Sequence, residues 1–359
     1  MSDCVVCDSS LNQIKHNYDF NLVTSDCRIW YKRAQLAYCN SCGLVQRPRT
    51  AEWREECIKI YSDYEPYRQG AREEPKTFDS RGLAESRSSK LLKYFLSEFN
   101  IYEGEWLDYG CGDGSFLRML SSLARGFRLS GFDVSYHNKS IVENEKTSFF
   151  SNLSNINKDF QVISLIHVFE HLDKPIEELL ALKQCLHDDG LLLIQVPSYE
   201  LHPFDLTVYD HGCFFSIETL TFTLKNAGFE VVQITSSVIH KEITAVCKKA
   251  IVNSGVVPKN TSEQLVESSL MYLDRILSEA IEHSKLSPIN IFGTSIGATW
   301  LTGNLERDKI RCYLDEDLSR VGHILFEKDI LAPNAELLKN AILPLSKDIV
   351  NLIRRRFKL

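Results

Sequence analysis

The chain has 359 residues and a net charge of −7 at pH 7, and 44% of its residues are hydrophobic. This length exceeds that of one ordinary domain, so we expect two or three domains of a globular protein. The negative charge argues against broad electrostatic binding of nucleic acid. The sequence contains neither a signal peptide nor an apolar run of about 20 residues. It therefore predicts a cytoplasmic protein with no membrane partner, as a monomer or small homo-oligomer.

The first segment, residues 1–75, is rich in cysteine and tyrosine and ends in a polar stretch typical of a linker. Its two Cys-x-x-Cys pairs are Cys4 with Cys7 and Cys39 with Cys42. Four thiolates can surround Zn²⁺ as a tetrahedron, so the pairs predict a small Cys4 zinc-binding domain. Such a closed site would stabilise the fold rather than catalyse. The alternatives are reduced cysteines without metal, or a redox pair.

The second segment, residues 76–250, alternates between the apolar patterns of helices and strands. This alternation predicts a doubly wound α/β sheet, with strands apolar enough to be covered on both faces. In chain order, we expect helices over 86–99, 116–123, 176–186 and 217–226, and strands over 106–109, 128–134, 160–167, 191–196, 229–235 and 244–248.

A glycine cluster joins the first of these strands to the helix that follows it. The cluster comprises Asp108, Gly110, Gly112 and Gly114 in the pattern D-x-G-x-G-x-G. At such a junction a ligand lies beside the backbone, where a Cβ would block it. The spacing differs from the G-x-G-x-x-G of dinucleotide-binding proteins and resembles the first motif of class I S-adenosylmethionine methyltransferases. Asp133, at the end of the next strand, is expected to accept hydrogen bonds from both ribose hydroxyls of that cofactor.

Two further positions are expected beside S-adenosylmethionine. The run 163–175 resembles the segment at the end of the fourth core strand in many class I methyltransferases, which would place His167 near the cofactor. Glu170 and His171 are expected to brace this loop. Phe150 lies where the adenine-binding loop is expected, with a position in the core as the alternative.

The third segment, residues 251–359, opens with an amphipathic helix over about 262–283. Strands are expected over 289–293 and 310–314. We therefore expect a linker helix followed by a small Rossmann-like α/β domain. The loop after its first strand reads G-T-S-I-G, which is not a dinucleotide fingerprint.

The order of these three parts resembles that of sugar C-methyltransferases, which act on nucleotide-linked 4-keto-deoxysugars. The likeness covers nearly the whole chain. The run that contains Tyr64 and Tyr67 is similar to the tyrosine-rich segment that joins the zinc domain to the core in that family. Tyr209-Asp210-His211 is similar to the family's catalytic loop, which normally reads Glu-His where this chain has Asp-His.

The resemblance implies a reaction in which the 4-keto group acidifies the neighbouring C3–H. His211 would remove that proton, because the pKa of histidine is near neutral. Asp210 would accompany the base. Tyr64, Tyr67 and Tyr209 would bind or polarise the substrate. The expected partner is a nucleotide sugar or another small-molecule acceptor.

Three alternatives to this function stay open at the level of sequence. The chain could be an O- or N-methyltransferase in which His211 deprotonates a hydroxyl or amine of a sugar or other small molecule. It could be an NAD-type oxidoreductase, although the glycine spacing argues against this. It could also be a non-catalytic scaffold that assembles through its outer domains.

Overall fold

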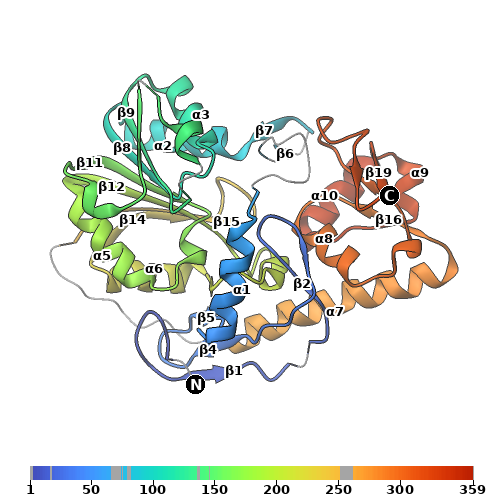
Figure 1. Cartoon of the computed structure of the whole chain (residues 1–359). Coiled ribbons are helices and arrows are strands. Elements are labelled where there is room, and N and C mark those ends of the chain that lie inside the picture. Colours follow the sequence, from blue (N-terminus) through green and yellow to red (C-terminus); the bar gives the residue numbers. More distant parts are fainter. Residues whose placement is uncertain are drawn as a thin grey trace.

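The computed structural model describes residues 3–16, 18–65, 74, 76–78, 82–135, 138–144, 146–250 and 262–358. Figure 1 shows a central sheet with a cysteine-rich N-terminal unit beneath it and a C-terminal unit beside it. Within the described ranges, no helix combines the length and apolarity that crossing a bilayer requires.

The N-terminal unit is a small antiparallel sheet that borrows one strand from a distant part of the chain. Its strands follow the order β1 (Leu11–Gln13), β4 (Ala37–Cys39), β5 (Val45–Gln46) and β13 (Cys213–Phe214). A second pair, β2 (Leu22–Val23) and β3 (Ile29–Trp30), lies beside α1 (Ala51–Ser62), whose N-terminus is capped by Thr50. Strand β13 belongs to the chain segment that forms the central unit, just before α6. Its pairing with β5 therefore joins the central unit to the N-terminal sheet.

The central sheet has seven strands in the order β10-β9-β8-β11-β12-β15-β14, and only β15 runs antiparallel to the others. The strand order reverses between β8 and β11. Ligands of such sheets bind at this switch point, beyond the carboxyl ends of the strands. The strands are β8 (Glu103–Tyr109), β9 (Gly126–Phe132), β10 (Thr147–Phe150), β11 (Phe160–Ile166), β12 (Leu186–Pro197), β14 (Phe229–Thr235) and β15 (Glu242–Lys249).

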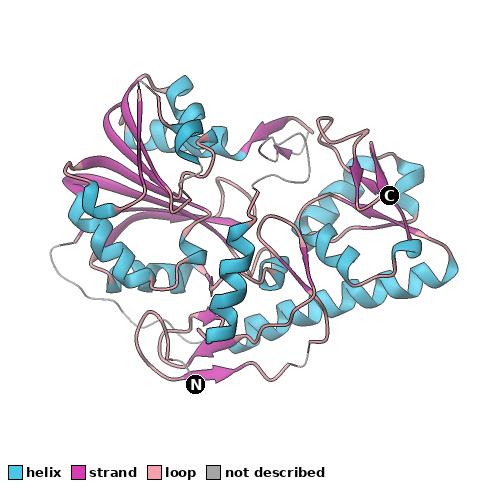
Figure 2. Ribbon diagram, viewed as in Figure 1, coloured by secondary structure: helices cyan, strands magenta, loops and turns pink. Residues whose placement is uncertain are grey.

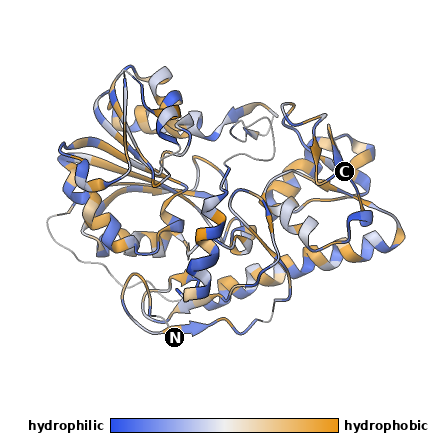
Figure 3. Cartoon of the chain, in the orientation of Figure 1, coloured by the Kyte–Doolittle hydropathy of each residue, from blue (hydrophilic) through white to orange (hydrophobic). Residues whose placement is uncertain are grey.

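Helices cover both faces of this sheet, as Figure 2 shows. Neighbouring side chains of one strand point to opposite faces, so Trp106 packs with α2 and α3 while Leu107 packs with α5 and α6. Apolar residues fill both layers, and the strands of the sheet are correspondingly hydrophobic in Figure 3. The helices are α2 (Arg87–Phe99), α3 (Ser115–Leu123), the short α4 (Lys139–Val142), α5 (Pro175–Cys185) and α6 (Ile217–Asn226).

The C-terminal unit is a five-stranded sheet in the order β18-β19-β17-β16-β20. Helix α7 (Ser262–Leu286), expected as a linker, starts next to the N-terminal unit and runs beneath the C-terminal unit in the view of Figure 1. Leu270 and Leu273 of α7 share one buried cluster with Leu22 and Phe204. The helix is thus part of a continuous core. The other elements are β16 (Ile289–Phe292), α8 (Ile296–Gly303), β17 (Ile310–Leu314), β18 (Ile324–Leu325), β19 (Lys328–Leu331), α9 (Ala335–Lys339), β20 (Ala341–Ile342) and α10 (Lys347–Phe357); a small hairpin, β6 (Lys76–Phe78) and β7 (Ala84–Ser86), precedes α2.

Candidate active site

The glycine loop follows β8 and is closed against β9, because the Gly110 N–H donates to the Phe132 carbonyl at 2.7 Å. Gly110, Gly112 and Gly114 have φ angles of +80°, +50° and +77°, which side chains disfavour. A Cβ on Gly110 would lie 2.3 Å from Val168 Cγ2, whereas a Cβ on Gly112 would meet nothing within 4 Å. Gly110 is therefore required by internal packing, and Gly112 borders open space beside the switch point.

Asp133 braces this loop from the end of β9. Its Oδ2 accepts from the Gly112 N–H at 2.9 Å, and its Oδ1 accepts from the Ser135 N–H at 2.7 Å. The Asn138 side chain also hydrogen-bonds to this carboxylate, so three of its four lone pairs are used, and a ligand with two hydroxyls would take the fourth and replace Asn138. Two hydroxyls on adjacent carbons fit this arrangement, as the ribose of S-adenosylmethionine would present them.

Asp108 lies within the sheet rather than in the loop. It is 3% exposed and accepts a 2.7 Å hydrogen bond from Ser164 Oγ of β11, which in turn accepts from Trp106 Nε1 at 2.9 Å. Burial raises the pKa of Asp108 to about 7. The residue links the two strands at the switch point, which positions the glycine loop.

His167 follows β11 with a φ of +56° and carries a network of charges. Its Nε2 lies 3.3 Å from Glu242 Oε2 and its Nδ1 lies 3.3 Å from Glu170 Oε1, while Arg87 donates to Glu242 at 3.1 Å. Burial lowers the pKa of His167, but the two carboxylates outweigh burial and raise it to about 9. The side chain is therefore a fixed cation at the ligand end of the sheet.

Phe150 is the last residue of β10, so the expected adenine-binding loop is at this point a strand end. Phe150 is half-buried, and its carbonyl accepts from the Asp133 N–H at 3.1 Å. The preceding Phe149 is 8% exposed and belongs to the core. Only Phe150 of the pair is accessible beside Asp133.

His211 lies in the loop between the 3₁₀ helix η4 (Pro203–Thr207) and β13. Its Nδ1 is 2.6 Å from Asp205 Oδ1, and both side chains are buried. Burial lowers the pKa of His211, but Asp205 outweighs burial and raises it. The His171 ring meets the His211 ring edge to face, with centroids 4.6 Å apart. Asp205 thus orients the His211 imidazole through Nδ1, so that Nε2 could accept a proton from a substrate.

Arginines of the N-terminal unit hold this loop in place. Arg47 donates to the carbonyls of Leu206 and Val208, and Arg49 donates to the carbonyl of Gly212 at 2.7 Å. Arg47 is 1% exposed and Arg49 is 7% exposed. Hydrogen bonds from charged donors to buried carbonyls are strong. Arg47 and Arg49 therefore hold the backbone of the loop that carries His211 in one position.

Asp210, expected beside the base, instead braces its surroundings. Its carboxylate accepts from the Ser25 N–H at 2.9 Å and the Ser25 hydroxyl at 2.5 Å, and lies 3.5 Å from His171 Nδ1. The Tyr61 hydroxyl is 2.9 Å from the same His171 nitrogen. Asp210 is fully buried, so it acts through these neighbours. The acid bonded to His211 is Asp205.

The expected tyrosines are not all at the site. Tyr209 is 2% exposed, its ring packs in the core and its N–H donates to the Val23 carbonyl, so it is a packing residue and does not contact a substrate in this arrangement. Tyr64 is exposed, and its ring lies 5.9 Å from that of Tyr61. Tyr67 lies outside the described residues.

Glu170 joins the cofactor side of the site to His211. Its carboxylate faces His167, and its backbone carbonyl accepts from the Gly212 N–H at 2.8 Å. Asp205, Tyr61, Arg87 and Glu242 were missed by sequence reasoning. They carry no motif, and they reach the site only through contacts between distant parts of the chain, such as the 155-residue separation of Arg87 and Glu242.

The four predicted cysteine ligands converge in the N-terminal unit. Cys4 Sγ is 3.6 Å from Cys42 Sγ, and Cys7 Sγ is 3.4 Å from Cys39 Sγ. All four sulfurs lie within 4.8 Å of one another. In a tetrahedral Zn–S₄ site with bonds of about 2.3 Å, the sulfurs are about 3.8 Å apart. The geometry therefore fits a zinc ion.

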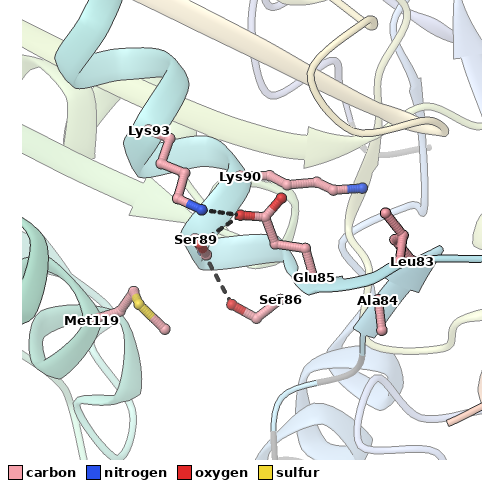
Figure 4. Close-up of a pocket in the computed structure, with 8 residues that line it drawn as sticks. All are labelled: Leu83, Ala84, Glu85, Ser86, Ser89, Lys90, Lys93 and Met119. Carbon is pink, nitrogen blue, oxygen red and sulfur yellow. Dashed lines mark hydrogen bonds and ion pairs between the residues drawn. The ribbon is translucent and has the colours of Figure 1, made fainter. Parts of the chain in front are cut away.

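A groove of about 610 Å³ lies apart from these residues, at the start of α2 (Figure 4). Glu85 there pairs with Lys93 at 2.6 Å and accepts from Ser89 Oγ at 2.8 Å. A smaller cavity of about 180 Å³ touches Gly114. Neither is lined by Asp133, His167 or His211.

Comparisons with known proteins relate the central unit to methyltransferases. A family model described as a methyltransferase domain matches residues 81–234. No curated protein matches the chain. Similar solved structures include the plantazolicin methyltransferase BpumL in complex with a monoazolic desmethylPZN analog and SAH (17% identity, TM-score 0.43, covering 55% of this chain and 95% of that one).

Two other similar structures are an S-adenosylmethionine-dependent methyltransferase from Clostridium acetobutylicum (15% identity, TM-score 0.38, 55% of this chain and 98% of that one) and human N-acetylserotonin methyltransferase with SAM (17% identity, TM-score 0.40, 46% of this chain and 52% of that one). At this similarity they say nothing of the acceptor. The family match covers the strands from β8 to β14, the glycine loop and Asp133, and it ends before β15. This chain therefore contains a methyltransferase domain, and its seven-stranded sheet has the class I methyltransferase fold.

Proposed function

We propose that the enzyme methylates a carbon next to the 4-keto group of a nucleotide-linked sugar, with His211 as the general base. The observation that carries this proposal is the buried Asp205–His211 pair, joined at 2.6 Å. It lies next to Gly212, whose N–H bonds to Glu170 at the ligand end of the sheet. A base is thereby held beside the place where the methyl donor is expected.

The expected donor site consists of Asp108, Gly110, Gly112, Gly114, Asp133, Phe150 and His167. S-adenosylmethionine bound there supplies an electrophilic methyl group. The Gly112 backbone leaves room for the ligand, and the Asp133 carboxylate can accept from two ribose hydroxyls when the ligand replaces Asn138. Asp108 and Glu170 position these groups without being exposed themselves.

His211 Nε2 would take the C3 proton, and Asp205 would stabilise the resulting imidazolium through Nδ1. The electron pair of the broken C–H bond would form the new C–C bond to the methyl group, while the sulfur–methyl bond would break and leave its electron pair on the sulfur of S-adenosylhomocysteine. His171 lies beside His211, and Tyr61 lies beside His171, so both are suited to hold the acceptor's oxygens. Asp210 would act as a positioning residue, Tyr64 stays a candidate for substrate binding, and so does Tyr67.

The Cys4 cluster is proposed to hold a structural zinc. Its sulfur separations support this, as does its link to the catalytic loop, since β5 pairs with β13 two residues after His211. Zinc would thereby fix both the small unit and the loop.

The test uses a panel of nucleotide sugars with methyl-labelled S-adenosylmethionine, and mass spectrometry of the products. We expect a 4-keto sugar to gain one methyl group and to exchange its C3 hydrogen with D₂O. His211→Asn should lower kcat by about 10²–10⁴-fold with cofactor binding retained. His187→Asn, remote from the site, is the control. Methylation of oxygen or nitrogen, without exchange at carbon, would refute C-methylation and support the alternative acceptor class.

A further inference from the structure

A second cluster of metal-ligating groups lies at the proposed active site. Glu170 and His171 come from the 3₁₀ helix η3 (Phe169–His171), and His211 comes from the loop after η4. One oxygen or nitrogen of each residue lies within 4.8 Å of those of the other two. Two histidines and one carboxylate are a ligand set that proteins use for divalent transition metals.

Both histidines are held as metal-bound histidines are. His211 Nδ1 bonds to Asp205 at 2.6 Å, and His171 Nδ1 lies 2.9 Å from the Tyr61 hydroxyl and 3.5 Å from Asp210 Oδ2. A hydrogen bond on one nitrogen fixes the ring and leaves the other as a ligand. Among the described residues, neither Nε2 has a hydrogen-bond partner or an ion pair.

Glu170 points independently to a bound cation. It is 1% exposed, and neither carboxylate oxygen has a hydrogen-bond partner. Oε1 has only the 3.3 Å ion pair with His167, and Oε2 has no ion pair within the described part of the chain. Oε1 is compensated by His167, so within the described residues it is Oε2 that lacks a partner, and a buried charged oxygen in that state is costly unless it coordinates a metal.

The surrounding charge also favours a cation. Glu170, Asp205 and Asp210 are each at most 2% exposed. Across the described ranges, none of the three forms an ion pair with a lysine or arginine, and their ion pairs are with histidines alone. A divalent ion would offset this buried negative charge.

We propose that Glu170, His171 and His211 bind a divalent transition-metal ion of the Zn²⁺, Co²⁺ or Ni²⁺ class. One ligand atom of each residue lies within 4.8 Å of those of the other two, which is near the separation of about 4.2 Å or less that two ligands of one ion have; since each Nδ1 is hydrogen-bonded, Nε2 is the ring nitrogen that would coordinate. The protein supplies three ligands and leaves positions for water or an acceptor.

Metal binding would regulate the enzyme, and this consequence rests on the proposed function. The lone pair of His211 Nε2 can take a proton or bind a metal, but not both. A bound ion would therefore inhibit methyl transfer and leave S-adenosylmethionine binding at Asp133 unchanged.

The test is a Co²⁺ titration, followed by visible absorption, of full-length protein that carries one zinc per chain in the cysteine cluster and has been freed of any other metal. We expect one added Co²⁺ per chain, with d–d bands and without the near-ultraviolet band of cobalt–thiolate bonds. Glu170→Gln and His171→Asn should each weaken this binding at least tenfold. Asp205→Asn, which removes the partner of His211, should weaken it by about 10–100-fold. His187→Asn is the matched control.

Circular dichroism and S-adenosylmethionine affinity check that each variant is folded. The proposal is overturned if no Co²⁺ binds outside the cysteine cluster, or if binding is equal in folded Glu170→Gln, His171→Asn and control proteins. Because the readout is spectroscopic, it stands even if no nucleotide sugar is methylated. In an enzyme with measurable transfer, Co²⁺ should lower kcat and leave the cofactor Kd unchanged.

Discussion

Replacing Asp133 by alanine separates the ribose-binding role of this carboxylate from a purely structural one. Each carboxylate oxygen accepts one backbone N–H, from Gly112 or Ser135, and the Asn138 side chain also hydrogen-bonds to the carboxylate, so a ribose would take the remaining lone pair and replace Asn138. A hydrogen bond to a charged group contributes about 1.5–3 kcal/mol. Loss of two such bonds to ribose should raise the Kd of S-adenosylmethionine by about 10²–10⁴-fold.

Isothermal titration calorimetry of the folded variant measures this change. Asp113→Ala is the matched control, because Asp113 lies in the same loop but bonds only to Ser115 and Arg118. Its Kd should stay within about threefold of the wild-type value. An Asp133→Ala protein that binds S-adenosylmethionine as tightly as the control would refute the ribose role.

Two other predictions concern stability and metal content. Burial raises the pKa of Asp108 to about 7, above its unfolded value of about 3.9, so its contribution to stability is full below that unfolded value and is lost as pH rises through 7. Between pH 5 and 8, the unfolding free energy of the wild type should fall by about 2–3 kcal/mol relative to that of Asp108→Asn, as measured by urea titration at each pH. Parallel plots of unfolding free energy against pH for the two proteins would contradict this. Metal analysis should find about one tightly bound zinc per chain. Removal of this zinc by a chelator should increase the rate of amide hydrogen exchange in residues 210–216. An unchanged exchange rate there would show that the metal does not stabilise this loop.

The central unit was predictable because its signals are local. Apolar runs and helical spacing between residues 86 and 248 gave most helices and strands, and the glycine loop and Asp133 follow a fixed spacing. By contrast, β10 was missed because its four residues are too short to show a period. Helix α1 was missed because charged residues interrupt its apolar face, so that its burial depends on tertiary contacts.

The catalytic cluster was only partly predictable. The sequence named His211 as the base and His171 only as a residue that braces the loop, and it named Asp210 as the accompanying acid where the structure has Asp205. It also named Tyr209, whose aromatic side chain is used for packing instead. No sequence period distinguishes a buried tyrosine from an exposed one in an irregular loop. That distinction depends on α1, β2 and β3, which fold against the loop from the other end of the chain.

The pairing of β5 with β13 has a consequence for how the protein is made. Arg49 and its partner Gly212 are separated by 163 residues, and β13 follows immediately. At about 5–20 residues per second, the ribosome needs about 8–33 s between them. During that interval the nascent cysteine unit lacks its fourth strand, and its thiolates are exposed to whatever metal or oxidant is present. A metal held by these cysteines, as proposed, could thus be acquired during synthesis, before the loop that carries His211 exists.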